Sequence, residues 1–370
     1  MTKICVYAIC KNESKFINRW LASMSEADYI VVLDTGSTDG TYEKLMNDHR
    51  VKKVKQKIYD SFRFDVARND SLKLVPKDAD VLVCTDIDEI FEPGWADILR
   101  QNWVLGVNNR AHYQYAWSHL DNGAPTDVFI NDKIHTKDYF WKYPVHEVLC
   151  PNFSESEECV LNLNGVLLHH YPDLDRPDTR YFNLLQIRAE ENPTDCYSRY
   201  LLAREYGLAQ DYETAIREFE YTLSLPNIKS ESYLCYIGSL ILRADLLVAV
   251  GRLDDAVYAY EHILLEDKTY REPYLKLANI YLNSGFYDVA IGYVLSGLRN
   301  SIQKYNWVEQ SPTWTYLADD TLSLAYFNIG EYEKAIQYCQ SALQYVPNDE
   351  RIKNNLNIFL STYQEQLNNK

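Results

Sequence analysis

The sequence predicts two domains of different fold class, a doubly wound α/β domain followed by an all-α domain of helical repeats. In the first half, short apolar strands alternate with amphipathic helices, and the strands begin 22 to 29 residues apart, the length of one βα unit. In the second half, pairs of helical segments recur. We expect the α/β domain over residues 1–175, a linker helix over 176–194 and the repeats over 195–370.

Four apolar segments are the strand candidates of the α/β domain. They are ICVYAI from Ile4, YIVVLD from Tyr29, the weaker VKKVKQKIY from Val51, and DVLVCTD from Asp80. Continuous apolar strands are typical of a parallel sheet covered by helices on both faces. Between the first two strands, one face of a predicted helix carries Phe16, Ile17, Trp20, Leu21 and Met24. After Gly106, aromatic-rich strand-like pieces predict an antiparallel extension of this mostly parallel sheet.

Recurring alanines mark the helical repeats of the second half. Ala215, Ala256, Ala290 and Ala335 are separated by 41, 34 and 45 residues. The step of 34 is the tetratricopeptide period, and the longer steps imply inserted turns or longer helices. Each unit has a Gly or Gln turn before the alanine, where two helices approach closely. We therefore expect three to four helical hairpins, closed by a more polar capping helix.

Composition indicates a globular protein in a reducing compartment. The chain is 46% hydrophobic and 24% charged, with a formal net charge of -16 and no block of Lys or Arg. Nucleic acids and anionic membranes, which need a basic face, are excluded as partners. Eight scattered cysteines without a C-x-x-C motif predict reduced thiols. No apolar run is long enough for a signal sequence or a transmembrane helix, so we expect a cytoplasmic protein.

Polar residues follow the first, second and fourth predicted strands. The three segments are CKNES from Cys10, DTGSTDGT from Asp34, and DIDE from Asp86. The carboxyl ends of parallel strands share one edge of a sheet, so these segments can converge on one ligand. Carboxylates spaced D-x-D at a strand end can hold Mg²⁺ or Mn²⁺. A solvated strand end is the alternative for D-x-D alone.

Residues 1–175 resemble a family 2 glycosyltransferase of the GT-A fold. The resemblance is carried by CKNES, VVLDTGSTDGT, FDVARNDSL and TDIDEIF. The later PVHEVL and LLHHYP resemble a bacterial subset that includes lipopolysaccharide-core glucosyltransferases, and peptide S-glycosyltransferases with a tetratricopeptide-like C-terminal half. This resemblance implies an inverting hexosyltransferase that uses Mn²⁺ or Mg²⁺. It would move a hexose or N-acetylhexosamine from a UDP-sugar to a peptide or protein.

The resemblance also implies roles for residues that would bind the nucleotide-sugar. Asn12, Glu13 and Asp34 would hold the uracil and ribose end, and Asp86 would lie near the ribose. Arg68 would contact the diphosphate, because a guanidinium matches phosphate oxygens in a bidentate way. Two alternatives stay open, a turn-capping role for Asp34 and a helix-surface ion pair for Arg68.

A metal site and a catalytic base are implied in the same way. The metal would be held by Asp88 and by a histidine, His170 rather than its neighbour His169, with Glu89 orienting them. Glu147 would be the general base and His146 would position sugar or acceptor, with Asp121 and Asp127 as competing bases. His135 stands where relatives tend to carry Arg, which leaves the diphosphate contacts of that strand open.

The repeats add a partner prediction and several alternatives. The array could recruit a peptide acceptor, mediate a homodimer or brace the other domain. A polysaccharide or lipid-linked glycan is the alternative acceptor, although no long basic amphipathic helix argues for membrane docking. A nucleotidyltransferase is a weaker option. An alternative of another class is a non-catalytic tetratricopeptide interaction protein with a degenerate α/β domain.

Overall fold

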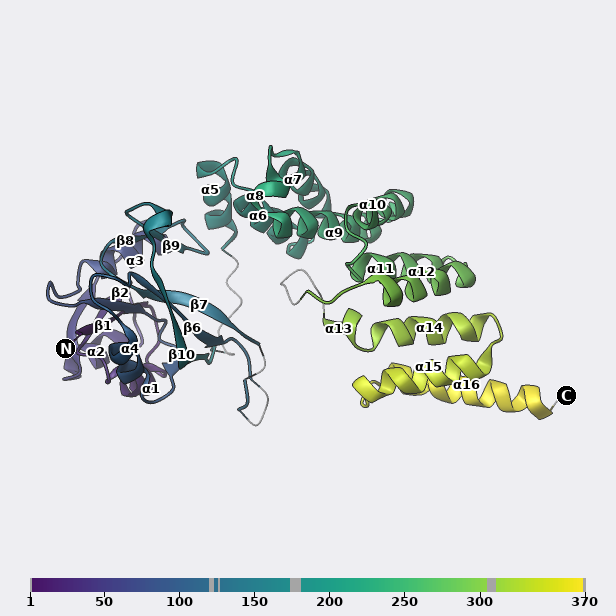
Figure 1. The fold of residues 1–370 in the computed structure, drawn as a ribbon, viewed down its shortest axis with the longest axis horizontal. Helices are drawn as coiled ribbons and strands as arrows, with labels where there is room; N and C mark the ends of the chain where they lie inside the picture. The colour runs from purple at the N-terminus through teal and green to yellow at the C-terminus, as the bar shows by residue number, and fades with distance from the viewer. Residues whose placement is uncertain (1, 120–122, 126, 174–180, 305–310, 369–370) are drawn as a thin grey trace. The chain divides into compact units, whose positions relative to one another are not determined.

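The computed structural model divides into two compact units, Met1–Arg188 and Ala189–Lys370. It describes residues 2–119, 123–125, 127–173, 181–304 and 311–368 (Figure 1). The division falls inside helix α5 (Phe182–Glu191), which overlaps the predicted linker helix. Residues 176–180 of that prediction lie outside the described residues.

The first unit is built on a mixed sheet of eight strands, in the order β3-β2-β1-β4-β7-β6-β10-β5. The strands are β1 (Ile4–Cys10), β2 (Tyr29–Asp34), β3 (Val51–Gln56), β4 (Val81–Cys84), β5 (Glu89–Phe91), β6 (Arg110–Ala116), β7 (Val128–His135) and β10 (Val160–His170). The four strands predicted for the first half are all present, and β3, β2, β1 and β4 run parallel as predicted.

The second half of the sheet departs from the predicted antiparallel extension. Strand β7 is antiparallel to both β4 and β6, and β5 is antiparallel to β10, but β10 runs parallel to β6. A parallel pair requires a long crossover. The chain supplies it through β7, the hairpin of β8 (Tyr139–Lys142) and β9 (Val148–Pro151), and a 3-10 turn at Glu155–Glu157.

Both faces of the sheet are covered. Helices α1 (Ile17–Met24), α2 (Thr41–Asn47) and α4 (Trp95–Asn102) pack on one face. Helix α3 (Phe64–Leu72) and the β8–β9 hairpin pack on the other. In α1, the side chains of Ile17, Trp20, Leu21 and Met24 are all buried, which confirms the predicted apolar helix face. The apolar strands are therefore buried between two layers, as their sequence predicts.

The second unit is a series of four helical hairpins and a final helix, which Figure 1 shows as successive antiparallel pairs. The pairs are α6 (Cys196–Leu208) with α7 (Tyr212–Ser224), α9 (Tyr233–Ala249) with α10 (Leu253–Glu266), α11 (Glu272–Asn283) with α12 (Tyr287–Asn300), and α14 (Leu317–Asn328) with α15 (Tyr332–Tyr345). Helix α16 (Glu350–Asn368) packs on α15, where the capping helix was predicted.

The unequal repeat steps have a structural cause. Helix α8 (Ile228–Glu231) lies in the connection that gives the 41-residue step, and α13 (Ser311–Trp314) lies in the one that gives 45. The four alanines that mark the repeats have no exposed surface. A helical-repeat domain is therefore confirmed. None of the helices in the described part of the chain has the length and apolarity to span a bilayer.

The turns inside the hairpins share one backbone conformation. The second residue after the end of the first helix has positive φ in each repeat, 64° at Gln210, 79° at Gly251, 81° at Gly285 and 83° at Gly330. Glycine adopts this left-handed conformation without strain, whereas a side chain costs about 1 kcal/mol or more there.

Replacing Gln210 with glycine is therefore expected to raise the free energy of unfolding of the repeat unit by about 1 kcal/mol. The matched change, Gly285→Gln, should lower it by a similar amount. Urea denaturation followed by far-ultraviolet circular dichroism measures both. Equal stabilities of the two variants would contradict this account of the turns.

Candidate functional site

A charged pocket of about 1110 Å³ lies within the first unit, at the carboxyl edge of the parallel strands. Pockets that bind small molecules commonly span about 300–1,000 Å³, so this one has room for a ligand of substantial size. Its polar and charged lining comes from segments far apart in the sequence: Lys11, Asn12, Glu13, Thr35, Arg68, Asp86, Asp88, Glu89, Lys133, His146, Glu147, His170 and Asp173.

The topology explains why these segments meet. Strands β1 and β4 are parallel neighbours with Tyr7 opposite Cys84, so the residues after β1 and β4 emerge at one edge. Strand β10 ends at the same place, because His170 pairs with Glu89 of β5 directly after the D-x-D segment. Of the three segments expected to converge here, the first contributes Asn12 and Glu13 to the pocket lining, the second Thr35 but not Asp34, and the third Asp86 and Asp88; His170 lines the pocket beside them.

Arg68 occupies the centre of an ion-pair network. Its guanidinium, in a residue only 3% exposed, donates from Nε to Glu147 Oε1 (2.5 Å) and from Nη2 to Asp86 Oδ1 (2.8 Å). Nη1 lies 3.1 Å from Cys84 Sγ, and the group sits over the Trp141 ring. Three of its five N–H groups therefore have protein partners. The two carboxylates bind Arg68 directly, so at most two N–H groups remain for a ligand.

Lys133 on β7 is a second cation in the pocket, and the sequence analysis did not select it. Its Nζ lies 3.8 Å from Asp86 Oδ2. Desolvation raises the pKa of Asp86, but the charges of Arg68 and Lys133 outweigh it and hold that pKa below its ordinary value. Asp86 is therefore a carboxylate held between two cations. A lone lysine in a half-polar strand gave no signal of this role.

Glu89 supports the segment that carries Asp86. It is almost fully buried, and its carboxyl accepts hydrogen bonds from the Tyr115 hydroxyl and from the Asp86 backbone N–H, both at 2.8 Å. Burial, together with the nearby Asp86 charge, raises the pKa of Glu89 to about 7. Glu89 thus fixes the backbone of the D-x-D segment through its hydrogen bond to the Asp86 N–H.

Asp88 and His170 form the pair predicted to hold a metal. His170 Nε2 lies 3.3 Å from Asp88 Oδ2, and the Trp117 ring stacks on the imidazole at 4.5 Å between centroids. Burial lowers the pKa of His170, but the hydrogen bond and charge of Asp88 outweigh it, so that the pKa is raised. The neighbouring carboxylate therefore favours the imidazolium form of His170.

The adjacent histidine faces elsewhere. His169 Nδ1 lies 2.9 Å from His119 Nε2, and His169 Nε2 lies 3.3 Å from Glu92 Oε1. Successive side chains of a strand point to opposite faces, so only one of the two histidines can meet Asp88. That histidine is His170, the one predicted.

The metal prediction has a partial structural basis. Among the described residues, no group of three or more His, Cys, Asp or Glu side chains is arranged to hold a metal ion. Asp88 and His170 offer one carboxylate oxygen and one imidazole nitrogen to the pocket. Mg²⁺ and Mn²⁺ commonly bind through one or two protein groups and complete their shell with ligand oxygens and water. The pair fits such a site.

Asp34 has a structural position rather than a pocket position. It is fully buried, and its Oδ1 accepts hydrogen bonds from the Gly36 N–H (2.9 Å), the Ser37 N–H (2.8 Å) and Gln56 Nε2 (3.0 Å). Asp34 is not among the described residues that line the pocket. The geometry thus corresponds to the turn-capping alternative for Asp34.

Asn12 and Glu13 do line the pocket. Asn12 has a φ of 58°, and its Oδ1 accepts from the Thr38 N–H at 2.8 Å. The Glu13 N–H donates to Thr41 Oγ1, also at 2.8 Å. The two loops after β1 and β2 are therefore tied together beside the pocket.

Arg188, a residue of α5, fixes the backbone of the segment that carries His146 and Glu147. Tyr143 and His146 have positive φ values of 82° and 48°. The buried Arg188 donates from Nη1 to the carbonyls of Val145 (2.8 Å) and His146 (2.7 Å), and lies over the Tyr143 ring at 3.9 Å. Arg188 thereby fixes an unusual backbone that places Glu147 against Arg68. The sequence analysis missed Arg188, because it lies more than 40 residues from the segment.

The remaining predicted residues lie away from the pocket or outside the described residues. Asp121 falls outside them. Asp127 accepts a hydrogen bond from Ser118 Oγ and is not among the pocket-lining residues. His135 is the last residue of β7 and is fully buried, and its ring contacts Tyr7 and Thr136 instead of a ligand site.

Several solved structures resemble about half of the chain. No family model and no curated protein matches. MamA from Desulfovibrio magneticus RS-1 covers 46% of this chain and 85% of its own, with 15% identity and a TM-score of 0.38. TTC0263, a thermophilic TPR protein of Thermus thermophilus, covers 48% and 88% with 18% identity and a TM-score of 0.36. YrrB, described as a TPR protein with an unusual peptide-binding site, covers 49% and 84% with 13% identity and a TM-score of 0.37.

These comparisons correct the main functional prediction. Two of these three structures are described as TPR proteins, and no glycosyltransferase is among the three. The predicted transfer of a sugar from a UDP-sugar is therefore wrong. The GT-A assignment of the first unit remains unconfirmed. The prediction went beyond what the motifs show, because a D-x-D at a strand end indicates a polar sheet edge and does not specify which ligand binds there.

Proposed function

We propose that this chain is a protein-interaction protein whose helical-repeat unit binds a segment of a partner protein. The observation that carries the proposal is a row of polar side chains on successive first helices of the hairpins. Asp245 on α9, Lys276 and Asn279 on α11, and Thr321 on α14 make up this row, which we call the repeat face.

The contacts along the repeat face connect one hairpin to the next. Lys276 Nζ lies 2.9 Å from Asp245 Oδ2, and Thr321 Oγ1 lies 3.4 Å from Asn279 Oδ1. Asp245, Lys276 and Asn279 are partly exposed. Amide, ammonium and carboxylate groups at this spacing can pair with the backbone and polar groups of an extended peptide. In repeat proteins, residues that recur on one side of the stack form an extended binding surface.

The repeat face is tested by peptides selected from a random library against the full chain. The double variant Lys276→Glu/Asn279→Arg is expected to weaken binding of these peptides at least tenfold. It reverses the charge at position 276 and places a larger side chain on the repeat face. The control is Tyr258→Arg, a 73% exposed position on α10 outside the repeat face. Equal loss in both variants, or no loss in either, would contradict the proposal.

A second candidate function is favoured by the charged pocket of the first unit. We propose that Asp88 and His170 bind Mn²⁺ or Mg²⁺, whose remaining coordination positions are filled by water and by an anionic ligand. The cation would replace the proton that His170 shares with Asp88. Lys133 and the free N–H groups of Arg68 supply positive charge for the anion.

Substitution of either proposed metal ligand is expected to weaken the binding of Mn²⁺ to the chain. Asp88→Asn and His170→Gln should each weaken Mn²⁺ binding at least tenfold, measured by the electron paramagnetic resonance signal of free Mn²⁺. Asp97→Asn removes an exposed carboxylate on α4 and should leave the affinity unchanged. If His170→Gln binds Mn²⁺ like the unaltered chain, the metal site is not at this pair.

A further inference from the structure

A second pocket of the first unit lies at the opposite edge of the sheet. It has a volume of about 520 Å³, and Leu72, Lys73, Val75, Lys77, Leu82, Lys137 and Tyr139 line it. Leu82 is the second residue of β4, whereas Asp86 follows the end of that strand. The two pockets are thus at opposite ends of the same strands, and neither shares a lining residue with the other.

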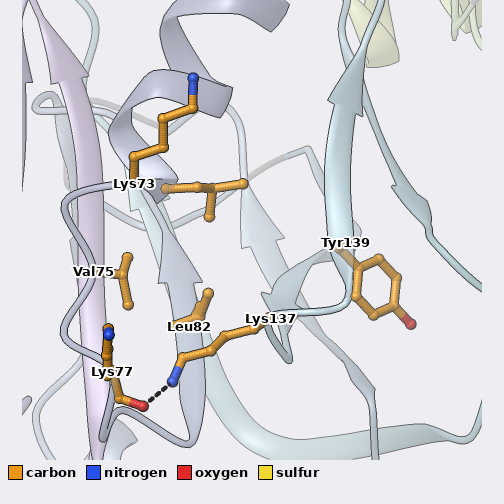
Figure 2. Close-up of a pocket in the computed structure, with 7 residues that line it drawn as sticks. Lys73, Val75, Lys77, Leu82, Lys137 and Tyr139 are labelled. Carbon is orange, nitrogen blue, oxygen red and sulfur yellow. Dashed lines mark hydrogen bonds between the residues drawn. The ribbon is translucent and has the colours of Figure 1, made fainter.

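The floor of this pocket is apolar and its rim is basic. Leu82 and Tyr139 are buried, and Leu72 and Val75 are half-buried beside them. Lys73, Lys77 and Lys137 also line the pocket, and in Figure 2 Lys137 extends toward Lys77 while the Lys73 side chain points away from Leu82. In a chain with a formal net charge of -16, three lysines around one apolar hollow are a local reversal of charge.

Two of the three lysines have no neutralising carboxylate. Lys73 pairs with Asp70 at 2.7 Å. The Lys137 ammonium instead donates to the backbone carbonyl of Lys77 at 2.5 Å, as the dashed line in Figure 2 shows. Within the described residues, no carboxylate lies within ion-pair distance of Lys77 or Lys137. A carbonyl oxygen satisfies one donor of an ammonium group, so Lys137 keeps two donors and its full charge.

The Lys137 side chain is exposed, and its ammonium group is turned toward the backbone of Lys77. Figure 2 shows its stem passing beside Leu82 toward Lys77. A lysine whose stem lies along apolar surface and whose head stays charged is suited to hold the anionic end of an amphipathic molecule.

We propose that this pocket binds a small amphipathic anion, with its hydrocarbon part against Leu72, Val75, Leu82 and Tyr139, and its carboxylate between Lys77 and Lys137. The volume lies within the range common for small-molecule sites. Apolar burial supplies affinity and the two ammonium groups supply selection for charge. This site is independent of the repeat face and of the charged pocket at the other edge.

The test uses the full chain and isothermal titration with decanoate and octanoate below their micelle concentrations, and with decanol below its solubility limit. Decanoate is expected to bind about 15-fold tighter than octanoate, because it has two more methylene groups and each buried one is worth about fourfold. Decanol, which has the same chain and no charge, should bind at least tenfold more weakly than decanoate. Salt should weaken the binding of decanoate, since the ammonium groups lie at the surface.

Charge variants decide where the anion binds. Lys77→Glu/Lys137→Glu should reduce decanoate affinity at least tenfold. Lys53→Glu/Lys55→Glu makes the same change in charge at two exposed positions of β3 and should leave it within twofold. Both pairs are at the surface, so neither is expected to unfold the chain. Equal binding of decanol and decanoate, an equal effect of the two double variants, or no binding of decanoate would overturn the proposal.

Discussion

Replacing Arg68 with methionine is expected to lower the free energy of unfolding of the first unit by about 3–5 kcal/mol. Methionine keeps most of the apolar stem but removes the charge that Asp86 and Glu147 share. Both Arg68 and Glu147 are largely withdrawn from water, so the lost partner leaves a carboxylate that is poorly solvated. Lys133 still neutralises Asp86, so the larger part of the loss should come from Glu147.

A double-mutant cycle measures the share of the lost stability that comes from the unpaired Glu147 carboxylate. Glu147→Gln in the Arg68→Met background should recover more than half of the lost stability, because it removes the unpaired charge and keeps the side-chain shape. Urea denaturation followed by tryptophan fluorescence reports mainly on this unit, which holds five of the seven tryptophans. Arg100→Met, at a partly exposed arginine of α4, is the control and should cost about 1 kcal/mol or less. A loss below 1 kcal/mol for Arg68→Met would contradict the network.

The second large effect concerns pH and His135. This residue has no exposed surface, and burial lowers its pKa from 6.5 to about 3. Its two ring nitrogens are satisfied in the neutral form: Nδ1–H donates to the Thr136 carbonyl (2.6 Å), and Nε2 accepts from the Tyr7 hydroxyl (2.7 Å). The Tyr7 hydroxyl in turn accepts from Trp141 Nε1 at 2.9 Å. A proton on Nε2 would break this chain of hydrogen bonds.

The sign of the pH effect follows from the lowered pKa. Below pH 6.5 the unfolded chain binds a proton at His135 that the folded chain does not bind until about pH 3. The contribution of this residue is therefore complete above pH 6.5 and is lost as the pH falls toward 3. The slope is about 1.4 kcal/mol per pH unit for one proton.

Comparison with His135→Gln isolates this contribution. The difference in unfolding free energy between the unaltered chain and the variant should shrink by about 2–3 kcal/mol from pH 7 to pH 4.5. Carboxyl groups with lowered pKa values, such as Asp39 and Asp48 (both to about 2), act equally in both proteins and cancel in the difference. A difference that is constant with pH would show that His135 accepts a proton in the folded state.

Much of the fold was predictable from the sequence because its signals are local. The period of apolar residues identified β1 to β4 and the face of α1, and the spacing of four buried alanines identified the hairpins. The insertion of β7 between β4 and β6, and the pairing of β5 with β10, depend on contacts between distant segments. No local pattern specifies such pairings, which is why the extension was predicted as antiparallel.

In the candidate site, too, some features were predictable from the sequence and others depend on contacts between distant segments. The pairing of Asp88 with His170 was expected from the family resemblance, and the structure places the two side chains 3.3 Å apart. The engagement of Arg68 by Glu147, the position of Lys133, and the support from Arg188 arise from chain segments that meet only in three dimensions. Asp34 could be read either as a ligand contact or as a turn cap, and its hydrogen bonds to Gly36 and Ser37 correspond to the cap.

Hydrogen exchange with a bound peptide tests the interaction function most directly. The full chain, with and without a peptide selected against it, is compared by mass spectrometry for amide exchange in each helix. The account predicts slower exchange in α9, α11 and α14, which carry the repeat face, and unchanged exchange in α10, α12 and α15. Protection confined to the second helices, or to the strands of the first unit, would contradict it.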